Sequence, residues 1–282
     1  MRGPHIIVRT LSRPAVRDKF GNVWQYHSRS DRHSKVACWS MLFDLLRHSP
    51  VLVDQVARGV VGFGINHEMY EFDTGRKKNL DLVLCTPGSS GRGRGPDFAE
   101  LAAEYEVDLS AAERRELAEL PRLPRLPVGS VHVALEAKAC MTAHIKALPR
   151  LFDELNSSHA AIHGAADFAI ATGFAIVNLC DTFLSPGLNE YKLGRRKPVV
   201  SRHRQPDDTL RTIGKLKEIR RRVSQNTGGF DALGIVVMRM ANDGTPVELV
   251  EQTPAPAPDD PWHYDQMIRR MASLYATKFA NL

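Results

Sequence analysis

The stretch VHVALEAKACMTAHIKAL, residues 131–148, decides the fold of this chain. Its first residues are mostly apolar, as in a buried β-strand, and a helical apolar spacing follows a few residues later. Glu136 and Lys138 stand two positions apart where the strand should end. Because side chains alternate between the two faces of a strand, both charges point to the same side. Two opposite charges on one face of a buried strand, next to a helix, suggest a chemical role.

The composition is that of a globular protein. Apolar residues make up 43% and charged residues 25% of the 282 residues, which allows one large α/β domain or two small ones. No apolar run reaches the length of a membrane span, and the first residues, MRGPHIIVRT, lack the apolar core of a secretory signal. The four cysteines form no CxxC pair, which argues against a zinc ribbon. We therefore expect a soluble cytoplasmic protein that makes no contact with a membrane.

The net charge of +6 is unevenly distributed along the chain. Residues 97–120 contain eight acids and two arginines, a net charge of −6, whereas residues 184–225 contain twelve Lys or Arg and four acids, a net charge of +8. A concentrated basic segment favours a polyanionic partner. The alternative, a solvated face that only keeps the protein soluble, fits the composition equally well.

Apolar spacing predicts a series of helices and strands. A helix is expected over residues 36–58, with a break or kink at Pro50. The strands 67–72 and 79–85 should form a hairpin, because residues 73–75 are turn formers. In the second of these strands, Leu80, Leu82 and Leu84 should share one face and Asp81 the other. The remaining predicted elements are an acidic helix over 97–120, strands over 131–138, 173–180 and 233–240, and helices over 141–158, 206–226 and 262–279.

This order of elements predicts an α/β (α+β) fold with a central mixed sheet flanked by helices. We divide the chain into three parts. Residues 1–35 form a basic and aromatic arm that contacts a partner or caps the core. Residues 36–240 form the core, with an insertion at 86–130 and the basic segment at 184–225. Residues 241–282 form a linker and a terminal helix.

Asp81 joins the charged pair if the second and third strands are neighbours. Two nearby carboxylates repel each other, more strongly when buried, and a divalent cation resolves the conflict. Mg²⁺ prefers oxygen ligands and usually takes one or two carboxylates together with waters and phosphate oxygens. Lys138 would then stand beside the metal, where it can orient an attacking water. This arrangement suits hydrolysis of a phosphodiester. The simpler alternative is a solvated Glu–Lys pair at a strand end.

The hairpin with Asp81, followed by Glu136-Ala137-Lys138 and a helix, resembles the PD-(D/E)xK nuclease superfamily. Leu80-Asp81 stands here where the family motif has Pro-Asp, and the resemblance covers roughly residues 39–180. It implies a restriction-endonuclease-like core in which Asp81, Glu136 and the backbone carbonyl of Ala137 bind Mg²⁺, with Mn²⁺ as a substitute. Glu68 is a further candidate ligand. The resemblance also implies that Lys138 positions the nucleophilic water.

Within that superfamily the chain is most similar to a type II restriction endonuclease, a sequence-specific enzyme that acts on double-stranded DNA. Cutting both strands requires two active sites, so we expect a homodimer. Because Lys and Arg bind phosphates, the expected DNA-binding residues are Lys192, Arg195, Arg196, Lys197, Arg202 and Arg204, together with Arg92 and Arg94. Two alternatives remain open: a repair, recombination or phage nuclease with the same core, and a nucleic-acid-binding protein without catalysis.

Overall fold

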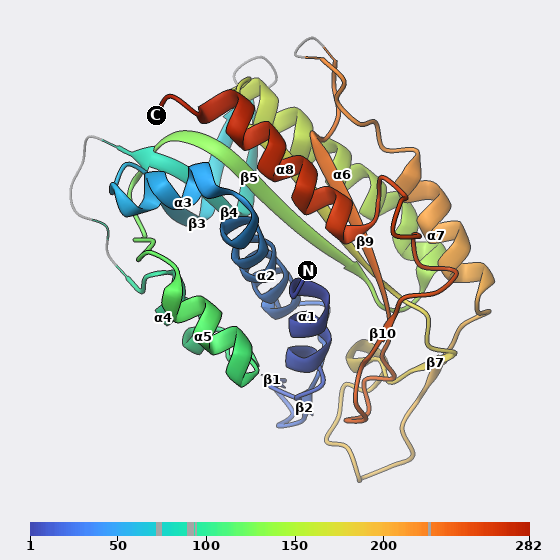
Figure 1. Cartoon of the computed structure of the whole chain (residues 1–282). Helices are drawn as coiled ribbons and strands as arrows, with labels where there is room; N and C mark the ends of the chain where they lie inside the picture. The colour runs from blue at the N-terminus through green and yellow to red at the C-terminus, as the bar shows by residue number, and fades with distance from the viewer. Residues whose placement is uncertain (72–74, 89–92, 94, 225–226) are drawn as a thin grey trace.

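A six-stranded mixed sheet forms the centre of the molecule in the computed structural model, which describes residues 1–71, 75–88, 93, 95–224 and 227–282 (Figure 1). The strand order is β10-β9-β6-β5-β4-β3. The strands are β3 (Gly62–Glu71), β4 (Arg76–Pro87), β5 (Val128–Cys140), β6 (Ile170–Asn178), β9 (Ala232–Arg239) and β10 (Glu248–Val250).

The sheet combines an antiparallel half with a parallel half. Strands β3, β4 and β5 form an antiparallel meander, β5, β6 and β9 run parallel, and β10 is antiparallel to β9. Parallel neighbours need a crossover, and α6 (His144–Ala165) supplies it between β5 and β6. All nine positions of β6 are buried, as expected of a central strand covered on both faces. The predicted mixed sheet flanked by helices is therefore confirmed.

Helices cover both faces of the sheet (Figure 1). On one face lie α1 (Gly3–Leu11), α2 (Arg32–His48) and α8 (Tyr264–Phe279), whose apolar residues form a core with the sheet around Trp39 and Phe43. On the other face lie α6 and α7 (Asp207–Lys217), which pack a second core around Leu155 and Phe230. The sheet thus separates two apolar cores.

Pro50 ends the first predicted helix, as expected. Helix α2 stops at His48, and α3 (Pro50–Ala57) begins at the proline itself. Proline is tolerated at a helix start because its missing N–H would have no partner there. The Ser49 side chain accepts a hydrogen bond from the Leu52 N–H and caps the new helix.

The predicted acidic helix over 97–120 is wrong, because two short helices occupy this region. These are α4 (Phe98–Glu104) and α5 (Ala111–Glu119). Each begins with a capping box, at Asp97 and at Ser110, and Glu106 between them has a φ of +52°. A capping box marks a helix start. The Ser110–Glu113 pair therefore begins a second helix inside the range for which the apolar spacing predicts a single one. Phe98 stacks on Trp39, with ring centroids 4.9 Å apart.

The two chain ends belong to the core, which corrects the division into an arm and a linker. Ile6, Ile7 and Leu11 of α1 are fully buried, and α8 buries Met267 and Ile268 against the sheet. Strand β10 extends the sheet beyond residue 240. Short strands complete the outer loops: β1 (Val16–Arg17), β2 (Val23–Trp24), β7 (Thr182–Phe183) and β8 (Ser201–Arg202).

Two further expectations need correction. The helix predicted over 206–226 ends at Lys217. Leu80 does not share a face with Leu82 and Leu84, because it packs in the core under α6 whereas they pack under α2. Asn66 stands opposite Asp81 in the register of the hairpin and has a φ of +50°. This left-handed residue interrupts the regular alternation at the position of Asp81.

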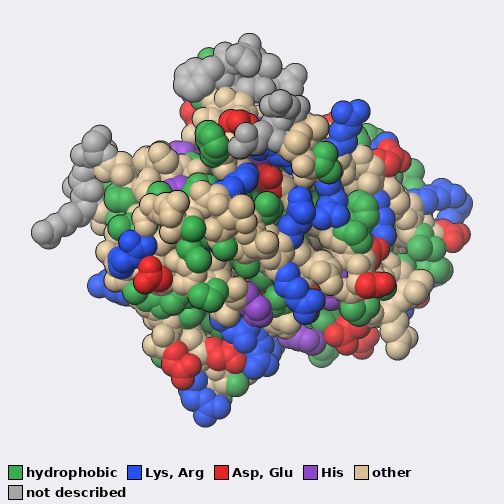
Figure 2. Space-filling model, turned by 45° about the horizontal axis from the view of Figure 1, so that its top comes forward, with side chains coloured by type: hydrophobic (Ala, Val, Ile, Leu, Met, Phe, Trp, Pro, Cys, Tyr) green, Lys and Arg blue, Asp and Glu red, His purple; other side chains and the backbone are tan. Residues whose placement is uncertain are grey.

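No helix in the part of the chain that the structure describes is long and apolar enough to cross a membrane. Figure 2 shows Lys and Arg side chains interspersed with Asp and Glu over the face that it presents, outside the residues drawn in grey. Neither sign of charge dominates that face.

Candidate active site

Strands β4 and β5 bring Asp81 to Glu136. The register pairs Leu82 with Leu135 and Val83 with Ala134, so the next positions along the two strands are Asp81 and Glu136. The Ala137 N–H donates a hydrogen bond of 3.0 Å to Asp81 Oδ2. The carboxylate of Asp81 therefore lies against the backbone that follows Glu136.

Lys138 completes the group that the sequence predicted. Its ammonium nitrogen Nζ lies 2.7 Å from Glu136 Oε1, and the Glu136 side chain is 1% exposed whereas that of Lys138 is 27% exposed. Both residues project from the same face of β5, as the two-residue spacing requires. The structure thus brings together the acid of one strand and the Glu–Lys pair of its neighbour.

Burial and charge perturb all three groups. Burial raises the pKa of Asp81, although the Ala137 N–H and the Lys138 ammonium oppose the rise. Burial also raises the pKa of Glu136, and the neighbouring charge of Asp81 raises it further. Burial lowers the pKa of Lys138, but Glu136 and Asp81 outweigh this effect and raise it overall. Two buried carboxylates that resist ionisation side by side form a place that favours added positive charge.

The donor set fits a hard divalent cation. Glu136 Oε2 is buried and has no hydrogen-bond partner among the described residues, which leaves a carboxylate oxygen without compensation beside Asp81. Asp81 and Glu136 would hold such a cation, and the Ala137 carbonyl is adjacent in the chain. No group of three or more His, Cys, Asp or Glu suited to a metal ion is found in the described part of the chain. One or two carboxylates are, however, what Mg²⁺ usually takes from a protein.

Two residues of this site were missed in the sequence. Lys78 of β4 has its Nζ 3.7 Å from Glu136 Oε1 and donates a hydrogen bond to the Glu154 carbonyl. Glu154 of α6 has its Oε2 3.7 Å from Lys138 Nζ. Lys138 therefore stands between two glutamates. A signal for Glu154 was present, because Ala147, Leu151 and Glu154 follow the helical spacing that keeps side chains on one face.

The site opens into a cleft of about 480 Å³. One wall carries Asp81 and Lys138 from the sheet and Glu154 from α6. The other wall is formed by residues 28–31 together with His33 and Ser34 at the start of α2. Burial, followed by the charge of Lys138, lowers the pKa of His33 to about 4, so this imidazole is neutral near pH 7.

Glu68 does not join the site. Its carboxylate pairs with Lys77 Nζ at 2.8 Å, and both side chains are at least half exposed. Glu68 lines a different hollow, with residues 129–131 and 165–169. On β3 it pairs with Asn79, and it is not among the residues that line the cleft of Asp81. Glu68 is therefore a surface residue.

The predicted basic residues lie between β7 and α7, on an exposed loop, which we call the basic loop, that includes the short strand β8 at Arg202. Lys192, Arg195, Arg196, Lys197, Arg202 and Arg204 are all exposed. Within the described residues, none of the six forms an ion pair. The Arg196 guanidinium carbon is 3.7 Å from the centroid of the Tyr191 ring. Arg92 and Arg94 lie outside the described residues.

This basic loop is attached to the cleft. His203 Nε2 and Thr142 Oγ1 form a hydrogen bond of 3.0 Å, and Thr142 lines the cleft that contains Asp81. His203 Nδ1 and the Cys180 carbonyl form a second hydrogen bond of 2.7 Å at the root of the loop. The basic loop is therefore joined to the cleft at His203, which lies between the exposed cations Arg202 and Arg204.

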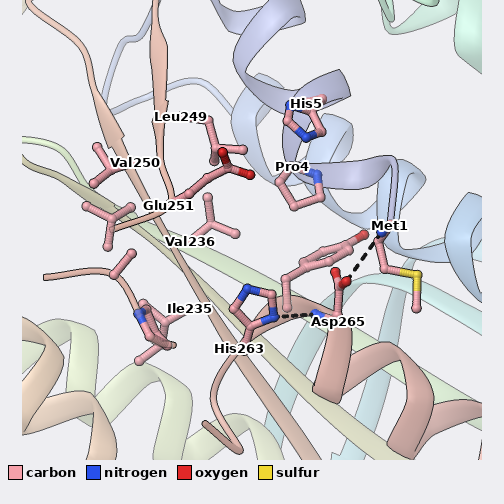
Figure 3. Close-up of a pocket in the computed structure, with 14 residues that line it drawn as sticks. Met1, Pro4, His5, Ile235, Val236, Leu249, Val250, Glu251, His263 and Asp265 are labelled. Atoms are coloured by element: carbon pink, nitrogen blue, oxygen red, sulfur yellow. Dashed lines mark hydrogen bonds and ion pairs between the residues drawn. The ribbon is translucent and has the colours of Figure 1, made fainter. Parts of the chain in front are cut away.

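A smaller cavity of about 140 Å³ lies between α1, β9, β10 and α8 (Figure 3). Its walls are both apolar and polar: Val236 and Leu249 lie beside Pro4, and Glu251 and His263 also line the cavity. His263 Nδ1 accepts a hydrogen bond from the Asp265 N–H, which caps α8. None of the residues that the sequence predicted for catalysis or DNA binding lines this cavity.

In comparisons with known proteins, no family model, no curated protein and no solved structure matches this chain.

Proposed function

We propose that this chain is a divalent-metal-dependent nuclease that hydrolyses DNA phosphodiester bonds, with Asp81, Glu136 and Lys138 as its catalytic residues. One observation carries the proposal. The Asp81 carboxylate is hydrogen-bonded to the backbone next to Glu136, and Glu136 keeps a buried oxygen without a partner. Such an oxygen is costly to bury, and a shared cation would remove that cost.

Each residue has a distinct role in the proposed reaction. Asp81, Glu136 and the Ala137 carbonyl would hold Mg²⁺, and Mn²⁺ would substitute for it. When bound, the cation lowers the pKa of a coordinated water and offsets the charge of the phosphate. Lys138 is protonated, since its pKa is raised overall despite burial. Its ammonium donates hydrogen bonds that orient the attacking water and the phosphate oxygen. The water oxygen attacks phosphorus in line with the 3′ oxygen, whose bond to phosphorus breaks. The water proton passes to that leaving oxygen, so the products are a 5′-phosphate and a 3′-hydroxyl.

The topology supports a restriction-endonuclease-like core. Helix α2, the antiparallel strands β3, β4 and β5, helix α6 and the parallel strand β6 occur in this order, with α3 inserted before β3 and α4 and α5 inserted before β5. This is the arrangement of elements around the motif that a resemblance to the PD-(D/E)xK superfamily implies. Leu80-Asp81 in place of Pro-Asp departs from the motif but leaves the aspartate in position.

The substrate we propose is double-stranded DNA, cut at a specific sequence by a homodimer, as in a type II restriction endonuclease. The exposed basic loop with its unpaired cations supports nucleic acid as the partner. A repair, recombination or phage nuclease would use the same core and the same three residues. A nucleic-acid-binding protein without catalysis is the second candidate, because Lys138 pairs with Glu136 Oε1 at 2.7 Å without any cation.

Incubation with plasmid DNA distinguishes these possibilities. Discrete fragments in Mg²⁺ that are absent in EDTA support a sequence-specific endonuclease, and a smear supports a non-specific nuclease. A band shift without cutting supports the binding protein. Glu136→Gln, which keeps the shape of the side chain, should abolish cutting, whereas the matched control Glu68→Gln should cut like the wild type. Equal cutting by both variants would refute the proposed site.

A further inference from the structure

A second hollow adjoins the active-site cleft. It has a volume of about 460 Å³ and is formed by residues 16–20 and 27–30 of the N-terminal segment, together with Pro186, Gly187 and Glu190. Residues 28–30 line both this hollow and the cleft that contains Asp81. The two spaces are therefore neighbours that share one wall, and a chain-like ligand can run from one into the other.

Three cations line this hollow. Arg17, Lys19 and Arg29 are exposed, and none of them forms an ion pair among the residues that the structure describes. Lys19 Nζ lies 5.0 Å from the centroid of the Phe20 ring, a contact that favours one orientation of the ammonium. Free cations beside a nuclease site are suited to phosphate groups.

Asp18, the acid among residues 16–20, accepts hydrogen bonds within its own turn. Asp18 accepts hydrogen bonds from the N–H groups of Phe20 and Asn22. It also accepts from the side chains of Asn22 and Trp24. Its oxygens therefore fix the turn instead of neutralising Arg17 and Lys19. Glu190, across the hollow, is the other acid of the lining.

The hollow is also joined to the basic loop. The Asn22 side chain donates to the Tyr191 carbonyl and accepts from the Leu193 N–H, both at 2.8 Å. A Cβ placed on Gly21 would lie 3.7 Å from Lys192 Nζ, so this ammonium lies over the turn. The N-terminal turn and the basic loop thus form one surface, although they are far apart in the sequence.

We propose that this hollow binds the phosphodiester backbone of the substrate on one side of the scissile bond, with Arg17 and Lys19 as its phosphate contacts. The inference rests on the proposed nuclease function, and it assigns the N-terminal segment a role in binding the DNA backbone. Ser28 and Ser30, with hydroxyl groups that can donate to phosphate oxygens, mark the path from the Asp81 site into the hollow.

The test measures DNA binding in EDTA, so that no cleavage takes place. A labelled duplex that spans both spaces is titrated with the wild type and with the double variant Arg17→Gln/Lys19→Gln at several salt concentrations. Each phosphate contact contributes about 0.9 to the slope of log K against log salt. Loss of two contacts should reduce the slope by about 1.8. The control double variant Arg58→Gln/Arg269→Gln removes two exposed arginines, one directly after α3 and one on α8, and should leave the slope unchanged.

A shortened duplex locates the contact. When the DNA on one side of the scissile position is removed, the wild type should lose the extra affinity and bind like the double variant. Melting curves verify that the double variant is folded. An unchanged slope, or the same loss of affinity with either flank removed, overturns this proposal even if the wild type cuts DNA. A reduced slope in a protein that does not cut supports the hollow and refutes the nuclease. A wild type that binds no DNA refutes both.

Discussion

Replacement of Lys138 by Met tests how the buried carboxylate of Glu136 is stabilised. Lys138 Nζ lies 2.7 Å from Glu136 Oε1, and Glu136 is 1% exposed. Removal of one partner of a buried ion pair destabilises a protein by about 3–5 kcal/mol. Lys78 Nζ, 3.7 Å from the same oxygen, retains part of the attraction. We therefore expect the lower end, about 3 kcal/mol, which in a chain of this size lowers Tm by about 6 °C.

The double variant Glu136→Gln/Lys138→Met removes both charges of this ion pair. Lys78 keeps its hydrogen bond to the Glu154 carbonyl, and Asp81 keeps the hydrogen bond from the Ala137 N–H. The free energy of unfolding of the double variant should lie within about 1 kcal/mol of the wild type. The wild type, Lys138→Met and the double variant are each unfolded thermally and with urea in EDTA. Lys77→Met is the matched control, because its partner Glu68 is half exposed and exposed pairs contribute about 1 kcal/mol or less. If Lys138→Met is as stable as the control, or if the double variant is no more stable than Lys138→Met, the ion pair does not stabilise the buried carboxylate.

Three more predictions concern stability and rate. Burial lowers the pKa of His132 to about 4, below the ordinary value of about 6.5. The neutral imidazole therefore stabilises the fold fully above about pH 6.5, and this stabilisation is lost as the pH falls to about 4. Between pH 7 and pH 4, His132→Leu should therefore lose about 3 kcal/mol less stability than the wild type in urea unfolding; an equal loss in both contradicts this. Asn178→Ala removes four side-chain hydrogen bonds to the backbone, three of them buried. It should lower the free energy of unfolding by about 3–4 kcal/mol, and a loss below about 1 kcal/mol would refute the role. In plasmid cleavage, Lys78→Met should lower the rate about tenfold and Lys138→Met at least about a hundredfold. A larger loss of rate in Lys78→Met than in Lys138→Met would contradict the assignment of Lys138 as the catalytic lysine.

Much of the sheet could be predicted from local pattern. Strands β5, β6 and β9 lie within about three residues of the predicted strands, because continuous apolar runs of this length are typical of covered strands. The break at Pro50 followed from the geometry of proline. Each of these signals depends on a residue and its immediate neighbours.

Features that depend on distant contacts could not be predicted. Ile6, Ile7 and Leu11 stand among basic and polar residues in the sequence, and only their packing against α2 and the sheet makes α1 part of the core. The split of the acidic helix was accessible in principle, since Ser110 and Glu113 form a capping box. The apolar spacing continues through this start signal and therefore predicts one helix over residues 97–120.

The same distinction applies to the active site. Asp81, Glu136 and Lys138 could be connected because they occupy neighbouring strands and a two-residue spacing. The helical spacing places Glu154 on the same face as Ala147 and Leu151, but its approach to Lys138 also depends on how α6 packs on the sheet. The position of Glu68 on the hairpin predicts a metal ligand, but its side chain lines another hollow and pairs with Lys77.

The most direct test of the shared-cation site is a titration with Mn²⁺ in which the free ion is measured by electron paramagnetic resonance. Wild type, Asp81→Asn, Glu136→Gln and Glu68→Gln are compared without DNA. Wild type and Glu68→Gln should bind Mn²⁺ with the same affinity, whereas each of the other two variants should bind at least about tenfold more weakly, because the site loses a charged ligand. Four identical titrations would show that Asp81 and Glu136 do not share a metal ion.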